Sequence, residues 1–145
     1  MLEVTGIDHI YIAVSDIKRS EIFYDAVMGI LGFRKSRFQL NGEQHVQYYN
    51  RHFGYVIRPA RSAAEHDSYR TGLHHFCMRV DTAKDVALAA KQLAEKNIMV
   101  SEPKLHPEYA PDYWAIYFTD PDAIRLEITN YRQERRDRHD RWDEK

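Results

Sequence analysis

The chain has 145 residues, one cysteine and a formal net charge of −1. This length suits one domain or one compact pair of half-domains. The near-neutral charge excludes the broad basic surface that general nucleic-acid binding requires. No apolar run approaches membrane length and no secretion signal is recognisable, so the sequence predicts a soluble protein. The lone Cys77 excludes an internal disulfide, which fits a cytoplasmic location.

The first predicted element is a strand over residues 7–14. Apolar and other positions alternate there, which puts His9 on the face opposite the aliphatic side chains. A helix follows, and Ser15 or Asp16 is suited to cap its start. Gly32 marks the end of the helical region. The predicted core-facing stripe of this helix consists of Ile22, Phe23, Ala26, Val27 and Ile30.

Three strands complete the first half, at residues 33–38, 44–49 and 54–58. The second half repeats the order. It begins with a strand over residues 73–80, and then Thr82 and Asp85 form a capping box for a second helix. Asn97 ends that helix, because asparagine tolerates the left-handed conformation. The apolar stripe consists of Val86, Ala89, Ala90 and Leu93, and the strands that follow are expected at 98–101, 113–118 and 124–129.

The predicted organisation is therefore one domain over residues 1–131, built from halves 5–60 and 73–131 with a linker at 59–72. The loop 102–112 contains three prolines and is long enough to act as a lid. Residues 132–145 form a charged tail. Trp142 is unusual in such a polar segment, so we expect it to dock on this chain or on a neighbour.

Three possible metal ligands occupy comparable places in these strands. His9 and His75 lie in the first strands of the two halves, and Glu127 lies in the last strand. Two imidazoles and one carboxylate form a set that holds a divalent metal while leaving positions open for substrate.

The order of the short motifs resembles the vicinal oxygen chelate superfamily. This group includes glyoxalase I, extradiol dioxygenases, fosfomycin-resistance enzymes and bleomycin-binding proteins. The resemblance is carried by Asp8-His9-Ile10, by Phe23-Tyr24 up to Leu31-Gly32-Phe33, by Leu73-His74-His75, and by Asp120-Pro121-Asp122 before Leu126-Glu127. It implies an α+β fold of paired βαβββ modules that form a cup-shaped mixed sheet with helices outside. Single-module relatives usually dimerise, so a homodimer is expected.

The resemblance implies that His9, His75 and Glu127 are the metal ligands, with His75 favoured over His74. Glyoxalase-like members carry a further ligand on the last strand of the first half, where this chain has Arg58. Ala123 also replaces the glycine that usually follows Asp-Pro-Asp. The absence of the further ligand favours a three-ligand site like that of the dioxygenases and fosfomycin-type transferases.

Three arginines and two tyrosines are candidates to bind the substrate or act on it. Arg58, Arg79 and Arg125 are candidates to bind an anionic group, because arginine pairs with carboxylates and phosphates through two hydrogen bonds. Strand alternation puts Tyr113 and Tyr117 on the face of the metal ligands. Tyr113 is therefore predicted to bind substrate and Tyr117 to donate a proton in catalysis.

These observations predict a metal-dependent enzyme that acts on a small, anionic molecule with vicinal oxygens, in a dioxygenase-like or lyase-like reaction. The ligands suit iron, manganese, zinc or nickel, so the metal stays open. Two alternatives remain: a bleomycin-binding type of protein that sequesters a small molecule without catalysis, and a fosfomycin-type thiol transferase.

Overall fold

The computed structural model describes residues 1–144 in two compact units, and each unit contains one βαβββ module. Unit 1 consists of Met1–His66 with Asp120–Ala123, and unit 2 consists of Asp67–Thr119 with the chain from Ile124 onward. Each module forms a mixed sheet of four strands, so the predicted α+β class with paired βαβββ modules is confirmed. The predicted boundaries at residues 59–72 and 131 stay predictions.

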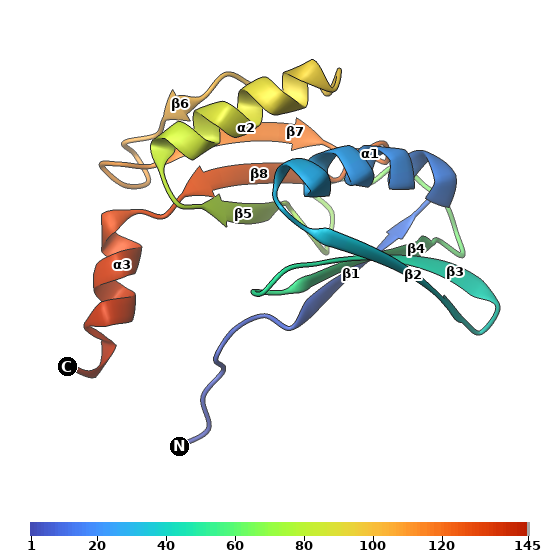
Figure 1. Cartoon of the computed structure of the whole chain (residues 1–145), viewed down its shortest axis with the longest axis horizontal. Coiled ribbons are helices and arrows are strands. Elements are labelled where there is room, and N and C mark those ends of the chain that lie inside the picture. The colour runs from blue at the N-terminus through green and yellow to red at the C-terminus, as the bar shows by residue number, and fades with distance from the viewer. Residues whose placement is uncertain (145) are drawn as a thin grey trace. The chain divides into compact units, whose positions relative to one another are not determined.

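In unit 1 the sheet has the order β1-β4-β3-β2, with β1 parallel to β4 and the other pairs antiparallel. One helix, α1, lies along one face of this sheet (Figure 1). Tyr24 of α1 contacts Tyr48 and Tyr55 on that face, at ring-centroid distances of 6.3 and 5.1 Å. The elements are β1 (His9–Val14), α1 (Ile17–Ile30), β2 (Arg34–Leu40), β3 (Glu43–Tyr49) and β4 (Gly54–Pro59).

The start of α1 was predicted correctly, and its buried face only in part. Asp16 caps the helix by accepting hydrogen bonds from the backbone N–H groups of Lys18 and Arg19. In the predicted stripe Val27 is buried, and Phe23, Ala26 and Ile30 are half-buried. Ile22 is 75% exposed, so the prediction is wrong at this residue. The buried residues are Ser20, Tyr24, Val27 and Met28.

A short turn from later in the chain explains the orientation of α1. The hydroxyl of buried Tyr24 donates to Asp120 at 2.8 Å and lies 3.0 Å from the hydroxyl of Tyr55. Asp122, in the same turn, accepts hydrogen bonds from the backbone N–H and the hydroxyl of Ser15 at the start of the helix. This polar network turns Tyr24 inward and leaves Ile22 in solvent.

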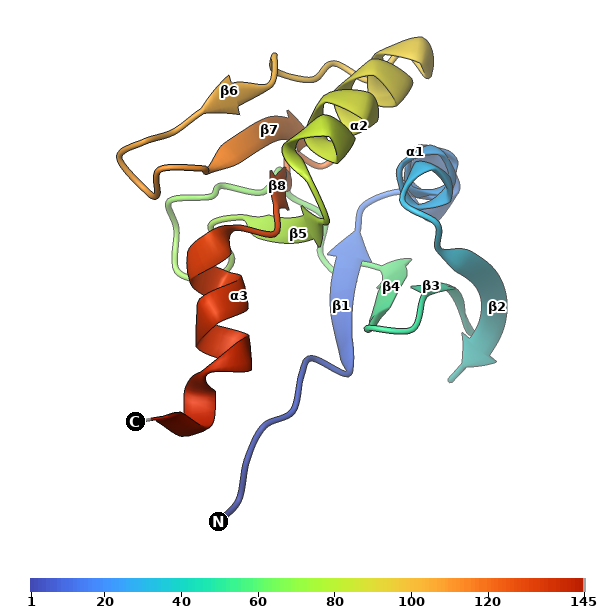
Figure 2. The ribbon, with the colours of Figure 1, turned by 60° about the vertical axis from the view of Figure 1, so that its left-hand side comes forward.

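In unit 2 the sheet order is β5-β8-β7-β6, with β5 parallel to β8. Figure 2 shows α2 along one face of this sheet and α3 continuing from the end of β8. Residues 98–101 were expected to form a strand, and this is wrong. The strand on this side of β7 is Lys104–Leu105, beyond Pro103, and Ser101 makes a single backbone hydrogen bond, to the carbonyl of Tyr117. The elements are β5 (Phe76–Val80), α2 (Ala83–Glu95), β6 (Lys104–Leu105), β7 (Trp114–Thr119) and β8 (Arg125–Asn130).

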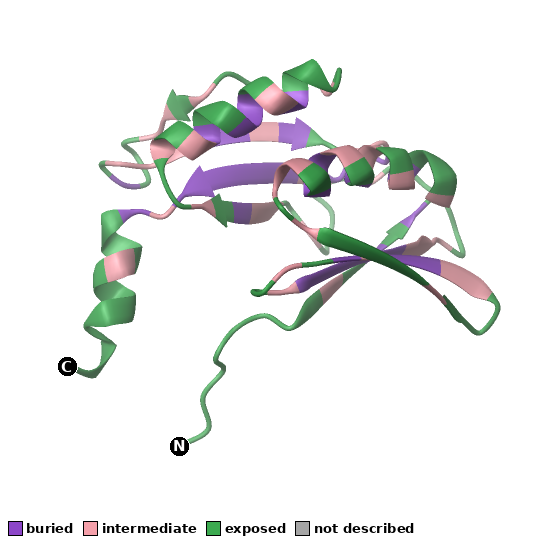
Figure 3. Cartoon of the chain, in the orientation of Figure 1, coloured by how far each residue is buried: buried purple, intermediate pink, exposed green. Residues whose placement is uncertain are grey.

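The second helix follows its sequence signals closely. Thr82 and Asp85 form the predicted capping box, and Asn97 adopts a left-handed φ of 59° just beyond the helix. The predicted stripe is buried in full: Val86, Ala89, Ala90 and Leu93. In Figure 3 the strand β8, an inner strand of this sheet, is coloured almost entirely as buried.

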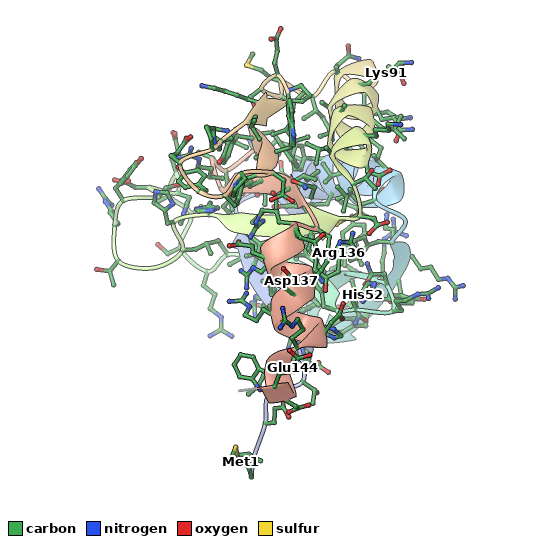
Figure 4. The ribbon with its side chains drawn as sticks, turned by 90° about the vertical axis from the view of Figure 1, so that its left-hand side faces the viewer. Met1, His52, Lys91, Arg136, Asp137 and Glu144 are labelled. Carbon is green, nitrogen blue, oxygen red and sulfur yellow. The ribbon has the colours of Figure 1, made fainter. Side chains whose placement is uncertain are left out.

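The charged tail forms a helix, α3 (Gln133–Asp140), and a short 3-10 turn at Trp142–Glu144. Figure 4 labels Arg136 and Asp137 on α3. Arg136 forms an ion pair with Asp81 at 2.6 Å, and its guanidinium stacks on Tyr131 at 4.2 Å. Trp142 is 58% exposed. Among the described residues, no helix is long and apolar enough to cross a membrane.

Candidate functional site

Glu127 is the centre of a polar cluster in unit 2. Its side chain is only 2% exposed although it carries a carboxylate. On the sheet, Cys77 of β5 and Tyr117 of β7 are its two register partners. The three side chains therefore share one face of the sheet, as strand alternation predicted for Tyr117 and Glu127.

Two further side chains bind the Glu127 carboxylate directly. The hydroxyl of Tyr113 donates to one carboxylate oxygen at 2.5 Å, and Nε2 of His75 lies 3.0 Å from the other. Nδ1 of His75 lies 2.7 Å from Nδ1 of His74. His75, rather than His74, is thus the histidine in contact with the glutamate. A buried carboxylate needs such partners, because an unpaired charge away from water is costly.

The surroundings of Glu127 keep the neighbouring acidic groups protonated. Burial and the adjacent carboxylate raise the pKa of Cys77 to about 12 and that of Tyr117 to about 12. The same causes raise the pKa of Tyr113 well above its ordinary value. At neutral pH Cys77 is therefore a poor nucleophile, whereas both tyrosines keep a proton that they can donate in a hydrogen bond.

Arg132 belongs to this cluster, and the sequence analysis missed it by assigning it to the tail. Its side chain is 8% exposed, and its guanidinium lies over the ring of Tyr113 at 4.3 Å. It also donates to Thr129 at 3.5 Å and to Glu134 at 3.2 Å. The highly charged composition of residues 132–145 hid this residue. Its place only two residues beyond β8 was the available signal.

The three arginines proposed to bind an anion each have a partner within the chain. Arg58 forms an ion pair with Glu43 in unit 1. In unit 2, the guanidinium of Arg79 stacks on Tyr131 at 3.8 Å, and that of Arg125 lies 5.1 Å from the ring of Tyr117. A cation over an aromatic ring keeps its charge available to a ligand, so Arg79 and Arg125 remain candidates, whereas the charge of Arg58 is largely compensated.

His9 lies in unit 1, at the start of β1, with its side chain 54% exposed. Its Nδ1 is 2.5 Å from a carboxylate oxygen of Asp8. A carboxylate bound to one ring nitrogen fixes the tautomer and leaves the other nitrogen, Nε2, as a possible metal ligand. The β4 residue that pairs with His9 is Gly54, so β4 offers no second ligand beside it.

The structure thus brings His75 and Glu127 together in unit 2 and places His9 in unit 1. Within residues 1–144 there is no group of three or more histidine, cysteine, aspartate or glutamate side chains that could hold a metal ion. The three-ligand site stays a prediction.

Comparisons with known proteins agree with this architecture. A family model described as the glyoxalase/bleomycin resistance protein/dioxygenase superfamily matches residues 6–128. Among curated proteins no match is found.

Several solved structures have the same fold at low sequence identity. A glyoxylase/bleomycin resistance protein/dioxygenase domain from Frankia sp. EAN1pec has a TM-score of 0.74 and 20% identity, covering 90% of this chain and 100% of its own. Lactoylglutathione lyase from Agrobacterium tumefaciens has a TM-score of 0.65 and 19% identity, with coverages of 88% and 94%. The fosfomycin resistance protein FosX from Listeria monocytogenes has a TM-score of 0.66 and 15% identity, with coverages of 92% and 99%.

Proposed function

The chain belongs to the glyoxalase/bleomycin resistance protein/dioxygenase superfamily, and from this premise we propose that it is a divalent-metal-dependent enzyme acting on vicinal oxygens of a small, anionic substrate. The observation that carries the proposal is the buried carboxylate of Glu127, held between His75 and Tyr113. We propose a cytoplasmic homodimer, in line with the single cysteine and with the resemblance to relatives that dimerise.

The donor atoms present fit a divalent cation. Glu127 supplies a carboxylate and His75 an imidazole nitrogen 3.0 Å away, and these are ligand types for iron, manganese, zinc and nickel. His9 is the third proposed ligand, taken from the family pattern and supported by the Asp8 carboxylate on its other ring nitrogen. When bound, such a metal supplies a Lewis acid toward substrate oxygens.

The remaining residues have roles that follow from their contacts. Tyr113 holds the Glu127 carboxylate in one orientation, and Arg132 packs on the ring that makes this contact. Tyr117 stays protonated at neutral pH and is the proposed proton donor. Arg125, stacked on Tyr117, is placed to attract an anionic group of the substrate toward that proton.

We favour a dioxygenase-like or lyase-like reaction, and the main alternative is a protein that sequesters a small molecule without catalysis. An open hollow in unit 1, with His9 and Tyr11 among its lining residues, would serve either role. A thiol transferase of the fosfomycin type is the third candidate. Metal content separates the metal-dependent enzyme from the sequestering protein, because a sequestering protein needs no resident metal.

The direct test replaces Glu127 by Gln, with Glu95→Gln on the surface of α2 as a matched control. Iron(II), manganese(II) and zinc(II) are titrated into each metal-free protein. Glu127→Gln should weaken binding of at least one metal by more than the roughly 10–100-fold that loss of an outer-shell partner costs. Glu95→Gln should leave all three affinities unchanged, because Glu95 is exposed and faces Lys91. Equal affinities in parent and Glu127→Gln would refute the assignment.

A further inference from the structure

Unit 1 has a hollow of about 760 Å³ on the sheet face opposite α1. The two faces are distinguished by strand alternation, because Tyr48 and Tyr55 point to the helix while Gln47, Tyr49 and Val56 point to the hollow. A cavity of this size falls within the range of small-molecule sites.

The hollow has aromatic walls. Tyr11 from β1 and Phe38 from β2 are among its lining residues, and so are Tyr49 from β3 and Phe53 from the turn after it. Rings from separate strands offer flat apolar surfaces to a planar ligand, and aromatic pairs gain more than their buried area alone.

A buried histidine supports two of these walls. The ring of His45 stacks on Phe38, with centroids 4.8 Å apart and planes inclined by 25°, and it meets Tyr11 edge-on at 5.7 Å. His45 is 0% exposed, and its Nδ1 lies 2.9 Å from the carbonyl oxygen of Glu43. Its Nε2 has no hydrogen-bond partner among the described residues. His45 itself is not among the lining residues, so it acts on a ligand only through the two rings that it holds in place.

One end of the hollow is polar, and a glycine shapes it. Gly54 pairs with His9 across β4 and β1. A Cβ atom at Gly54 would lie 3.4 Å from Cβ of His9 and 3.6 Å from the amide nitrogen of Gln47. These distances place the Gln47 carboxamide over Gly54 and near His9, although Gln47 itself pairs with Val56 in register.

The charged groups at this end favour an anion. Arg51 and His52, on the turn between β3 and β4, line the hollow together with His9 (His52 is labelled in Figure 4). The one carboxylate in the lining, Asp8, is already bound to His9 at 2.5 Å. A ligand carboxylate or phenolate would therefore meet the guanidinium of Arg51, while the carboxylate of Asp8 is engaged by His9.

We propose that this hollow binds a planar aromatic anion, with the Gln47 carboxamide holding one of its oxygen atoms beside His9. We take this ligand to be the substrate of the proposed enzyme, and only that step rests on the proposed function. Gln47 of β3 then supplies the polar contact beside His9. The β4 residue at that position, Gly54, has no side chain to do so. The aromatic walls set the shape of the ligand, and the carboxamide sets the position of its oxygen.

The test measures binding of 2-hydroxybenzoate to the metal-free protein by calorimetry, with 2-hydroxycyclohexanecarboxylate as a saturated analogue of similar size. The aromatic compound should bind at least tenfold more tightly than the saturated one. Gln47→Leu keeps a branched side chain, one bond shorter, and removes the carboxamide, and it should weaken aromatic binding about fivefold to tenfold. Gln39→Leu, on exposed β2 outside the hollow, is the matched control and should bind as the parent does.

A second variant guards against a general loss of folding. Gln47→Glu keeps the shape of the side chain, so the fold should survive, while its negative charge repels the ligand anion and binding falls. Equal binding of the two probes, no binding of either, or an unchanged Gln47→Leu would overturn the proposal. Because these measurements use metal-free protein, they are independent of the metal titration of Glu127→Gln.

Discussion

Replacing Tyr113 by Phe removes one hydroxyl from the Glu127 cluster and leaves the rest of the ring in place. That hydroxyl donates to the buried carboxylate at 2.5 Å. The contact of the Arg132 guanidinium with the ring, at 4.3 Å, survives the change because it needs only the aromatic face. The substitution therefore isolates one hydrogen bond to a charged group.

The expected loss of stability follows from this geometry. A hydrogen bond to a charged group contributes about 1.5–3 kcal/mol, and a carboxylate that is 2% exposed has little water to replace it. Part of this free energy is regained, because phenylalanine has no hydroxyl group that must lose its water on folding. We expect a net loss of about 1–2.5 kcal/mol in the free energy of unfolding. For a chain of this size that lowers Tm by about 3–8 °C.

The effect should also depend on pH in a defined direction. Burial and the Glu127 carboxylate raise the pKa of Tyr113, so the folded state holds this proton more tightly than the unfolded state does. The contribution to stability is full below the unfolded pKa of about 10 and declines as the pH rises above it. The stability difference between parent and Tyr113→Phe should therefore be constant from pH 7 to 9 and shrink above pH 10.

Urea unfolding followed by far-ultraviolet circular dichroism measures both effects. Tyr109→Phe is the matched control, because Tyr109 is 62% exposed and meets His106 and Tyr113 through its ring. It should change stability by less than about 0.5 kcal/mol. If Tyr113→Phe is as stable as the parent, or if Tyr109→Phe loses as much, the hydrogen bond to Glu127 does not contribute as argued.

Two other predictions concern surfaces away from this cluster. Burial alone would raise the pKa of Glu21, but hydrogen bonds from Lys35 and Arg37 lower it overall. Glu21→Gln should therefore cost about 1–2 kcal/mol at pH 7, and the difference should vanish in urea titrations as the pH falls from about 4.3 through the lower folded pKa. The homodimer should appear as twice the chain mass in light scattering at micromolar concentration. If Trp142 contributes to it, Trp142→Ala should shift the midpoint of dissociation to higher protein concentration, and a monomeric parent would refute the dimer.

Elements governed by local signals could be predicted from the sequence. The second helix is the clearest case, because the Thr82–Asp85 capping box and the left-handed Asn97 involve only neighbours in the chain. Strand alternation likewise placed Glu127, Cys77 and Tyr117 on one face, since a period of two leaves only two choices.

Long-range contacts explain what the sequence did not reveal. The orientation of α1 depends on a hydrogen bond from Tyr24 to Asp120, 96 positions away. Arg132 joins the Glu127 cluster by packing on Tyr113, although its neighbours in sequence are typical of a solvated tail. Gln47 lies near His9 only because β1, β4 and β3 pair in this register. Periodicity within one segment carries no information on such contacts.

Ala123 stands where glycine usually follows Asp-Pro-Asp, and this difference has a physical consequence that can be measured. Its φ is +65°, a conformation that costs an alanine about 1–2 kcal/mol, and this explains why glycine is usual there. Ala123→Gly relieves that cost but adds about 0.4–1 kcal/mol of unfolded-chain entropy. The net result should be a stabilisation of about 0.5–1 kcal/mol in urea unfolding. The same substitution at Ala87, exposed within α2, should instead destabilise by about 1 kcal/mol, because glycine is a poor helix former. If both substitutions destabilise equally, the turn after Asp122 is not strained and the alanine there costs nothing.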